Sequence, residues 1–449
     1  MPIKKQKSKN DAHWPNDYPD PSWFIQDRFG MFIHFGLYSI AARHEWVMTH
    51  EQMSPKDYRK YFDHFNPDLF NADEWVEYAK NAGMKYLVIT TKHHDGFALW
   101  DTKLTDYKIT NTPFGRDLLA ELVQACRKEN IKIGFYHSLI DWHHPDFPLD
   151  GHHPQREDKK ARAKNKQRSM KNYVEFLHGQ VRELLEDYGK IDYIWFDFNY
   201  PEQDWGWAKG KGPKNWQSKK LEEMILDLQP HIIINDRLGL NRGVTTPEQY
   251  QPSEPLKENE QTVIWEACQT FNGSWGYDPQ NLHWKSSEDV IKMLIDTVSK
   301  DGNLLFNIGP NGRGEFDQPT IKRLDDISDW MRLHERSIIG TGHSQYKAPA
   351  DCRLTQKENR LYLHIFSWPF GQIQLKGLAG KVSYAQFLHD ASEVQFTNYS
   401  AEKEIDPALL TEADKIALNN SSVTENSLVF DLPTPKPEIV VPVIEIFLE

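Results

Sequence analysis

Between about residues 25 and 340, short apolar runs alternate with segments of helical periodicity. The runs are apolar nearly throughout, which is typical of parallel strands covered on both faces. Strand and helix repeated this often predict a parallel sheet, and the length of the region favours a TIM-like (β/α) barrel over an open sheet. Seven strands are recognisable, so the eighth strand of a full barrel is either missed or absent. The predicted strands span residues 30–35, 86–90, 131–137, 193–197, 232–236, 262–266 and 304–307.

The segments between the strands carry helix start and stop signals. Asn71 and Glu74 form a capping box ahead of a helix that Gly83 ends, and Ser286 and Asp289 repeat the box before a later helix. Apolar stripes at helical spacing predict further helices around residues 119–126, 173–188 and 321–331. No GxGxxG motif follows the first strand, which disfavours a dinucleotide-binding sheet.

The pattern changes near residue 345, and it predicts three parts. Residues 1–24 form an N-terminal extension and residues 25–344 a catalytic barrel. Residues 345–449 show short alternating runs punctuated by Pro and Gly, which predict an antiparallel β-sandwich. A polar, basic and His-rich insertion over residues 141–172 follows the third strand, so we expect a loop or lid on the catalytic face.

Charge and cysteine content narrow the function classes. The net charge of -12 argues against nucleic acid or an acidic membrane as the main partner. The three cysteines, Cys126, Cys268 and Cys352, are widely spaced and suggest neither a disulfide framework nor a zinc knuckle. The first fifteen residues are basic but are followed by no apolar stretch, which predicts a cytoplasmic protein as the sequence stands, or a periplasmic or secreted one if a signal was trimmed.

Nearly every predicted strand ends in polar functional residues. In a barrel of this type, catalytic residues project from the carboxyl ends of the strands. Each residue alone has a structural explanation, because a strand-end Asp often caps the next helix and a single His is often a satisfied core group. Their coincidence on one rim predicts an active site there. The residues are His34, Lys92, His93, His94, Asp95, Tyr136, His137, Asp197, Asp236, Arg237, Glu266 and Asn307.

Asp197 ends an apolar strand in the run WFDF. A carboxylate in such surroundings must be hydrogen-bonded or paired with a cation. Arg237, on the next strand, is within plausible reach, and this pairing would keep Asp197 ionised, as a nucleophile requires. A purely structural Asp–Arg salt bridge is the alternative.

The tandem pair His93 and His94 allows a second interpretation, a metal-dependent hydrolase. On an extended backbone the two side chains point to opposite sides, and they are possible zinc ligands. The first strand offers only His34, however, and no closed ligand set can be assembled. Neutral His and Trp beside Arg and carboxylates suit a pyranose better, because they supply hydroxyl partners and a flat apolar wall.

At these residues the chain resembles glycoside hydrolase family 29, the α-L-fucosidases. The matching segments occur in family order and cover the whole predicted barrel. They are RFGMFIHFGLYS (residues 28–39), HEW (44–46), YLVITTKHHDGFALWDT (86–102), GFYHSLIDWHHP (134–145), IDYIWFDF (191–198), INDRLG (234–239), WEACQTFNGSWGYD (265–278) and DGNLLFNIGPNGRGEF (301–316).

The resemblance implies a retaining exo-α-L-fucosidase that hydrolyses terminal α-L-fucosyl linkages of oligosaccharides or glycoconjugates through a covalent fucosyl-enzyme intermediate. It implies that no cofactor is used. No metal is expected because no closed ligand set can be assembled, and the net charge makes neither nucleic acid nor membrane an expected partner. Asp197 matches the nucleophile, and Trp275 matches an aromatic that covers the C5-methyl side of the sugar. The residues that match fucose-binding positions are His34, Glu45, Trp46, His93, His94, Tyr136, Trp195 and Arg237. The phenylalanines flanking Asp197 depart from many relatives.

Two glutamates are candidates for the general acid/base residue. In the family this group comes from the loop region between the fifth and sixth strands, which contains Glu248 in GVTTPEQY. Glu266, in WEAC, is predicted to end the sixth strand and is the alternative acid/base or a further substrate-binding residue. We expect Glu248, because a loop carboxyl can approach the leaving group from above. A non-catalytic fucose-binding lectin is a rival from another class, and the presence of Asp197 and both glutamates argues against it.

Overall fold

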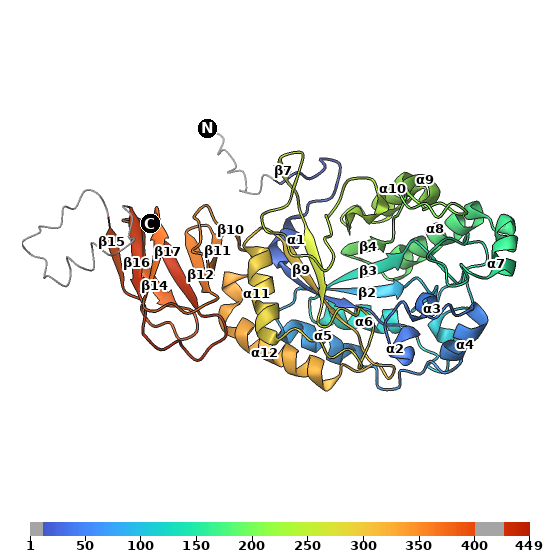
Figure 1. Cartoon of the computed structure of the whole chain (residues 1–449), viewed down its shortest axis with the longest axis horizontal. Helices are drawn as coiled ribbons and strands as arrows, with labels where there is room; N and C mark the ends of the chain where they lie inside the picture. The colour runs from blue at the N-terminus through green and yellow to red at the C-terminus, as the bar shows by residue number, and fades with distance from the viewer. Residues whose placement is uncertain (1–11, 400–425) are drawn as a thin grey trace, which may run out of the picture. The chain divides into compact units, whose positions relative to one another are not determined.

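A curled parallel sheet forms the core of the first of two compact units in a computed structural model, which describes residues 12–399 and 426–449 (Figure 1). The strands lie in the order β5-β4-β3-β2-β1-β9-β8 and pair in parallel throughout. They are β1 (Phe29–Ile33), β2 (Tyr86–Lys92), β3 (Lys132–Ser138), β4 (Tyr193–Asp197), β5 (Ile233–Ile234), β8 (Glu266–Thr270) and β9 (Asn303–Ile308). Every residue of β1, β2, β8 and β9 is buried, as expected for strands covered on both faces.

The segment 244–249 takes the eighth position of the barrel. It bonds to the β5 edge of the sheet, where Val244 N donates to Ile234 O at 3.0 Å. It also bonds to the β8 edge, where Gln249 N donates to Cys268 O at 3.0 Å, and its isolated bridges are parallel on both sides. The segment contains a proline and mostly polar residues, so it has no apolar run that marks it as a strand in the sequence.

The prediction that the sixth strand spans residues 262–266 is wrong about where this strand begins. Residues up to 262 lie instead in a small hairpin of β6 (Lys257–Glu258) and β7 (Gln261–Thr262), and the barrel strand β8 begins at Glu266. The apolar run Val263, Ile264 and Trp265 is buried just ahead of the strand rather than in it. Glu266 therefore stands at the start of its strand, not at its carboxyl end.

Two helices begin at the caps that the sequence predicts. α5 (Ala72–Asn81) starts after Asn71, whose side chain accepts a hydrogen bond from Glu74 N, and Gly83 then turns the chain at a φ of 80°. The Ser286–Asp289 capping box precedes α11 (Ser287–Val298). The other helices are α1 (Ser22–Asp27), α2 (Tyr38–Ala41), α3 (Val47–His50), α4 (Pro55–Asp63), α6 (Leu118–Lys128), α7 (Lys159–Lys164), α8 (Met170–Asp187), α9 (Pro213–Trp216), α10 (Ser218–Leu228) and α12 (Gln318–His334).

The second unit comprises residues 286–302 and 326–449 and contains two antiparallel sheets. One is β10 (Gly342–His343), β11 (Cys352–Lys357), β12 (Arg360–Ile365), β17 (Val443–Leu448) and β14 (Val382–Phe387). The other is β13 (Gln372–Lys376), β16 (Ser427–Asp431) and β15 (Phe396–Tyr399). Leu363 and Ile444 of the first sheet share one hydrophobic core with Leu375 and Phe430 of the second, which confirms the predicted sandwich. Residues 1–11 and 400–425 of the predicted parts lie outside the described residues.

No helix within the described ranges, residues 12–399 and 426–449, has the length and apolar character needed to span a membrane.

Candidate active site

A pocket opens at the carboxyl ends of the barrel strands, where the sequence predicts the site. All the predicted catalytic and sugar-binding residues except Glu45 and Glu266 line it. The lining residues are Phe32, His34, Trp46, His93, His94, Tyr136, Trp195, Asp197, Phe198, Arg237, Glu248, Cys268 and Trp275.

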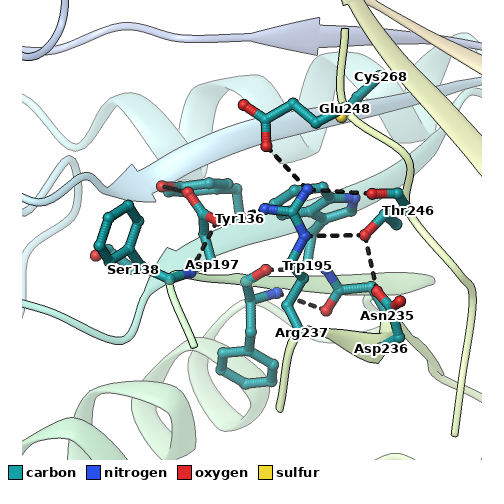
Figure 2. Close-up of polar contacts among 12 residues, drawn as sticks. Tyr136, Ser138, Trp195, Asp197, Asn235, Asp236, Arg237, Thr246, Glu248 and Cys268 are labelled. Carbon is teal, nitrogen blue, oxygen red and sulfur yellow. Dashed lines mark hydrogen bonds and ion pairs between the residues drawn. The ribbon is translucent and has the colours of Figure 1, made fainter. Parts of the chain in front are cut away.

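Asp197, the last residue of β4, accepts hydrogen bonds at both carboxylate oxygens (Figure 2). Its Oδ1 accepts from Arg237 Nη1 and from Phe198 N, each at 2.8 Å. Its Oδ2 accepts from Tyr136 OH at 2.8 Å, and His94 Nε2 lies 3.7 Å from the same oxygen. Donors of this kind, one of them a cation, fix the orientation of the carboxylate.

Arg237 joins two carboxylates through one guanidinium. Its Nη1 binds Asp197, and its Nη2 donates to Glu248 Oε2 at 2.9 Å. Its Nε donates to Thr246 Oγ1 at 3.0 Å, and the guanidinium carbon lies 4.8 Å from the centre of the Trp195 ring. Burial would lower the pKa of Arg237, but the two carboxylates raise it above its ordinary value, so the group stays cationic.

The two carboxylates differ in access to solvent. The side chain of Glu248 is 41% exposed, whereas that of Asp197 is 15% exposed. Glu248 reaches the pocket because segment 244–249 takes the eighth barrel position beside β8. The sequence places Glu248 in a loop, and the structure shows that this loop is the irregular barrel strand itself.

His34 is a neutral acceptor at the pocket wall. Its Nδ1 lies 2.7 Å from Asn307 Oδ1, and the Asn307 amide nitrogen donates to Trp275 O at 2.7 Å. Because the amide orientation is fixed by that second bond, His34 Nδ1 is the donor and its Nε2 carries a lone pair. Burial lowers the pKa of His34 to about 3, which keeps the imidazole neutral.

His93 and His94 do not point to opposite sides, as an extended backbone would require. They follow the end of β2 in a turn, and both rings line the pocket with their centres 4.0 Å apart. Ser138 Oγ donates to Ile140 O, so His94 Nδ1 must donate to Ser138 Oγ, 2.7 Å away. His93 Nδ1 is buried and has no hydrogen-bond partner among the described residues, and burial lowers the pKa of both histidines well below its usual value.

Glu45 lies behind the pocket rather than in its lining. Its buried Oε2 accepts from Trp275 N at 3.0 Å and from Gly276 N at 2.9 Å. Burial raises the pKa of Glu45 to about 7, against these backbone donors. Glu45 therefore holds the turn that presents the Trp275 ring to the pocket.

Glu266 lies in the barrel interior below the pocket. Its carboxylate accepts from Tyr86 OH at 2.5 Å, from Tyr193 OH at 3.1 Å and from Trp195 Nε1 at 3.3 Å. Tyr86 and Tyr193 are the first residues of their strands, so Glu266 sits at the opposite end of the strands from Asp197. The prediction that Glu266 belongs to the catalytic rim is wrong, because its strand starts four residues later than predicted.

The structure adds three lining residues, Phe32, Phe198 and Cys268, that the sequence analysis did not assign to the site. Phe198 has a φ of 77°, a left-handed conformation that costs a bulky residue energy. Its ring lies 5.2 Å from that of Trp46 and 4.9 Å from that of His94, so it forms part of the pocket wall. The signal for Phe198 was its place directly after Asp197 in WFDF.

Across residues 12–399 and 426–449, no group of three His, Cys, Asp or Glu side chains is arranged so that it could hold a metal ion.

Comparison with known proteins assigns the family. A sequence model of the α-L-fucosidase family matches residues 2–336. The solved structure of α-L-fucosidase isoenzyme 1 from Paenibacillus thiaminolyticus is 41% identical, covers 96% of this chain and 98% of its own, and superposes with a TM-score of 0.86. Tissue α-L-fucosidase of Mus musculus is 28% identical over 82% of this chain and 86% of its own.

A third relative carries mechanistic information of its own. A family 29 α-L-fucosidase from Bacteroides thetaiotaomicron, 26% identical over the full length of both chains with a TM-score of 0.80, was solved as a trapped covalent intermediate with 2-fluoro-fucosyl fluoride. With the barrel, the sandwich and a pocket of neutral histidines around Asp197 and Arg237, these matches lead to one conclusion: the chain belongs to the α-L-fucosidase family of glycoside hydrolases.

Proposed function

We propose that this enzyme is a retaining exo-α-L-fucosidase that removes terminal α-L-fucosyl groups from oligosaccharides or glycoconjugates. Asp197 is the nucleophile and Glu248 the acid/base. The observation that carries the assignment is the single guanidinium of Arg237, which binds Asp197 at 2.8 Å and Glu248 at 2.9 Å. Two carboxylates held by one guanidinium lie close enough to act on the same glycosidic bond, as a retaining mechanism requires.

In the first step, a carboxylate oxygen of Asp197 forms a bond to the anomeric carbon while the bond from that carbon to the leaving oxygen breaks. Glu248 gives its proton to the leaving oxygen, and a β-fucosyl ester of Asp197 remains. In the second step, Glu248 takes a proton from water, and the water oxygen displaces Asp197. The product is α-L-fucose, so the configuration is retained after two inversions.

The two carboxyl environments fit these different tasks. Asp197 is shielded and held by Tyr136, Arg237 and a backbone amide, which orients a charged nucleophile. Glu248 is the more exposed group and can exchange protons with water between steps.

The remaining pocket groups fit a deoxy sugar. The free Nε2 lone pair of His34 is available to a hydroxyl group of the sugar, and His93 lines the same pocket. Trp275, held from behind by Glu45, offers an apolar face to the C5-methyl side. The trapped covalent intermediate of the Bacteroides relative supports the same two-step course.

Replacement of Asp197 by Gly tests the nucleophile. We expect turnover of an aryl α-L-fucoside to fall by several orders of magnitude, because covalent catalysis fails entirely. Azide should fill the space left by the carboxylate, restore cleavage and yield β-fucosyl azide, which NMR identifies. A variant that keeps more than about a tenth of wild-type turnover would refute the assignment.

A further inference from the structure

The carboxylate of Glu266 is fully buried and has no role in the two steps above. It binds three donors from two strands across the barrel, β2 and β4, and one of them is the indole N–H of Trp195. Indole has a single donor and no acceptor, so this hydrogen bond sets the direction of the Trp195 ring within its plane. Trp195 precedes Asp197 by two residues on β4, so both side chains point to the same face of the sheet.

The Trp195 ring supports both side chains that hold Asp197 (Figure 2). The Tyr136 ring stacks on it, with centres 5.6 Å apart and planes 19° from parallel. The guanidinium of Arg237 lies 4.8 Å from the centre of the same ring. Tyr136 and Arg237 then donate to different oxygens of Asp197, each at 2.8 Å. A rotation of the Trp195 ring would therefore displace both donors.

We infer that Glu266 is a positioning residue for fucosyl transfer: through Trp195 it fixes Tyr136 and Arg237, and thereby the attacking carboxylate of Asp197. The inference rests on the proposed role of Asp197. Packing alone does not require an acid at this position, because burying a carboxyl without a cation is costly and a neutral side chain fills the same space. No ion pair joins Glu266 to a Lys, Arg or His in the described part of the chain. Burial raises its pKa to about 7, which is a measure of that cost.

The first test compares Glu266→Gln with Tyr193→Phe on an aryl α-L-fucoside. Gln keeps the size of the side chain but has one acceptor oxygen instead of two, so the hold on Trp195 weakens. Tyr193→Phe removes a hydrogen bond to the same carboxylate oxygen that Trp195 binds. The Tyr193 ring, however, meets Phe24 edge-on and does not support Tyr136 or Arg237. We expect Glu266→Gln to lower kcat about 10–100-fold with KM within about 3-fold, and Tyr193→Phe to change kcat less than about 3-fold.

Trp195→Phe provides an independent measurement if Glu266→Gln does not fold. It keeps an aromatic ring but loses the N–H, so it should reproduce the fall in kcat. The double variant should be no slower than the slower single variant, because both substitutions break one connection. Equal kcat losses for Glu266→Gln and Tyr193→Phe at matched melting temperatures would overturn the inference, and so would additive effects in the double variant.

Labelling with 2-fluoro-fucosyl fluoride separates this inference from the proposed function. Mass spectrometry of the wild-type peptide that contains Asp197 decides whether Asp197 is the nucleophile. The labelling rate decides the role of Glu266, because fluoride leaves without needing the acid. We expect Glu266→Gln to slow labelling about as much as it slows kcat, and Tyr193→Phe to label at nearly the wild-type rate. If both variants are labelled on Asp197 at the wild-type rate, the positioning role of Glu266 is rejected, while the assignment of Asp197 as nucleophile stands.

Discussion

Burial lowers the pKa of the pocket histidines, which keeps their rings neutral, and each ring keeps one nitrogen without a hydrogen bond to the described part of the chain. Each therefore offers a hydrogen bond that the folded protein leaves unused. For His34 and His94 the bond at Nδ1 fixes which nitrogen faces the pocket. A hydroxyl group bound there replaces no internal contact, so its contribution goes to substrate binding rather than to stability.

Ala variants of the pocket residues should separate binding from folding. We expect His34→Ala, His93→Ala, His94→Ala and Arg237→Ala each to cost about 2–4 kcal/mol of transition-state binding, because a buried polar group of the substrate loses its partner. The measurement is kcat/KM with an aryl fucoside, together with thermal melting. His364, a buried histidine of the sandwich, is the control: His364→Ala should lower the melting temperature and leave kcat/KM unchanged. If all four pocket variants unfold or keep normal kcat/KM, the residues are structural.

Glu248→Ala should discriminate between leaving groups. A poor leaving group needs the proton of the acid, whereas an activated aryl group does not, so turnover of the poor substrate should fall much further. Azide should restore the second step and give α-fucosyl azide, because it attacks the β-fucosyl ester. Equal losses on both substrates would contradict the assignment of Glu248.

At the scale of elements, the insertion over residues 141–172 borders the pocket, as the sequence predicts for a loop on the catalytic face. The ring of His152 lies 4.9 Å from Phe198 and 6.0 Å from Trp46, both of which line the pocket. Asp150 of the insertion forms a buried ion pair with Lys211, which lies in the segment that follows β4. The Tyr200 hydroxyl of the same segment donates a hydrogen bond to Asp150 at 2.6 Å, so two contacts connect the insertion to that segment.

Lys211→Met tests this tie between the two loops. Removing the cation leaves Asp150, which is fully buried, with an uncompensated charge and should destabilise the protein by about 3–5 kcal/mol. We also expect a higher KM, because His152 and Phe198 lose support. Lys209, whose pair with Asp204 is 72% and 52% exposed, is the matched control, and Lys209→Met should change little. A stability loss from Lys211→Met with unchanged KM would show that the loops do not shape the pocket.

For the molecule as a whole, two sets of buried groups respond to acid in opposite directions. Burial lowers the pKa of His34, His93, His94, His137, His153 and His364, with values of about 3 for His34, His153 and His364. These histidines take up protons on unfolding below pH 6.5, so acid favours the unfolded chain. Burial raises the pKa of Glu45, Asp95 and Glu266 to about 7, so between pH 7 and roughly 4.5 the folded state holds protons that the unfolded chain lacks.

We therefore expect stability to fall gently from pH 6.5 to about 4.5 and steeply between about 4.5 and 3. Between pH 6.5 and about 4.5, proton uptake by the three buried carboxyls in the folded state offsets part of the stability lost through the histidines. Below about pH 4.5 these carboxyls are protonated in both the folded and the unfolded state, so the offset no longer grows. Urea unfolding at closely spaced pH values, with the midpoint and slope followed separately, measures this. A midpoint that stays constant down to pH 3.5 would contradict the assignment of these histidines as neutral and buried.

Local sequence alone determined most of the barrel and the place of Asp197. Strands such as β2 and β4 are apolar because both faces are covered, so their positions can be read without knowing their neighbours. Asp197 follows from the same pattern, since a carboxyl at the end of a buried strand faces the rim. The caps at Asn71 and Ser286 are likewise local hydrogen bonds, and the structure confirms both.

Only the tertiary structure decided which glutamate reaches the rim. Residues 263–265 have the apolar character of a strand, but the paired register with β9 begins only at Glu266, opposite Asn303. Pairing with β5 and β8 turns the polar segment around Glu248 into the eighth barrel position. The hydrophobic pattern helps to set strand register, but the backbone partners of residues 266–270 lie far away in the chain, and the apolar run 263–265 does not reveal them. For this reason the sequence located Asp197 at the rim, while the positions of Glu248 and Glu266 required the closed barrel.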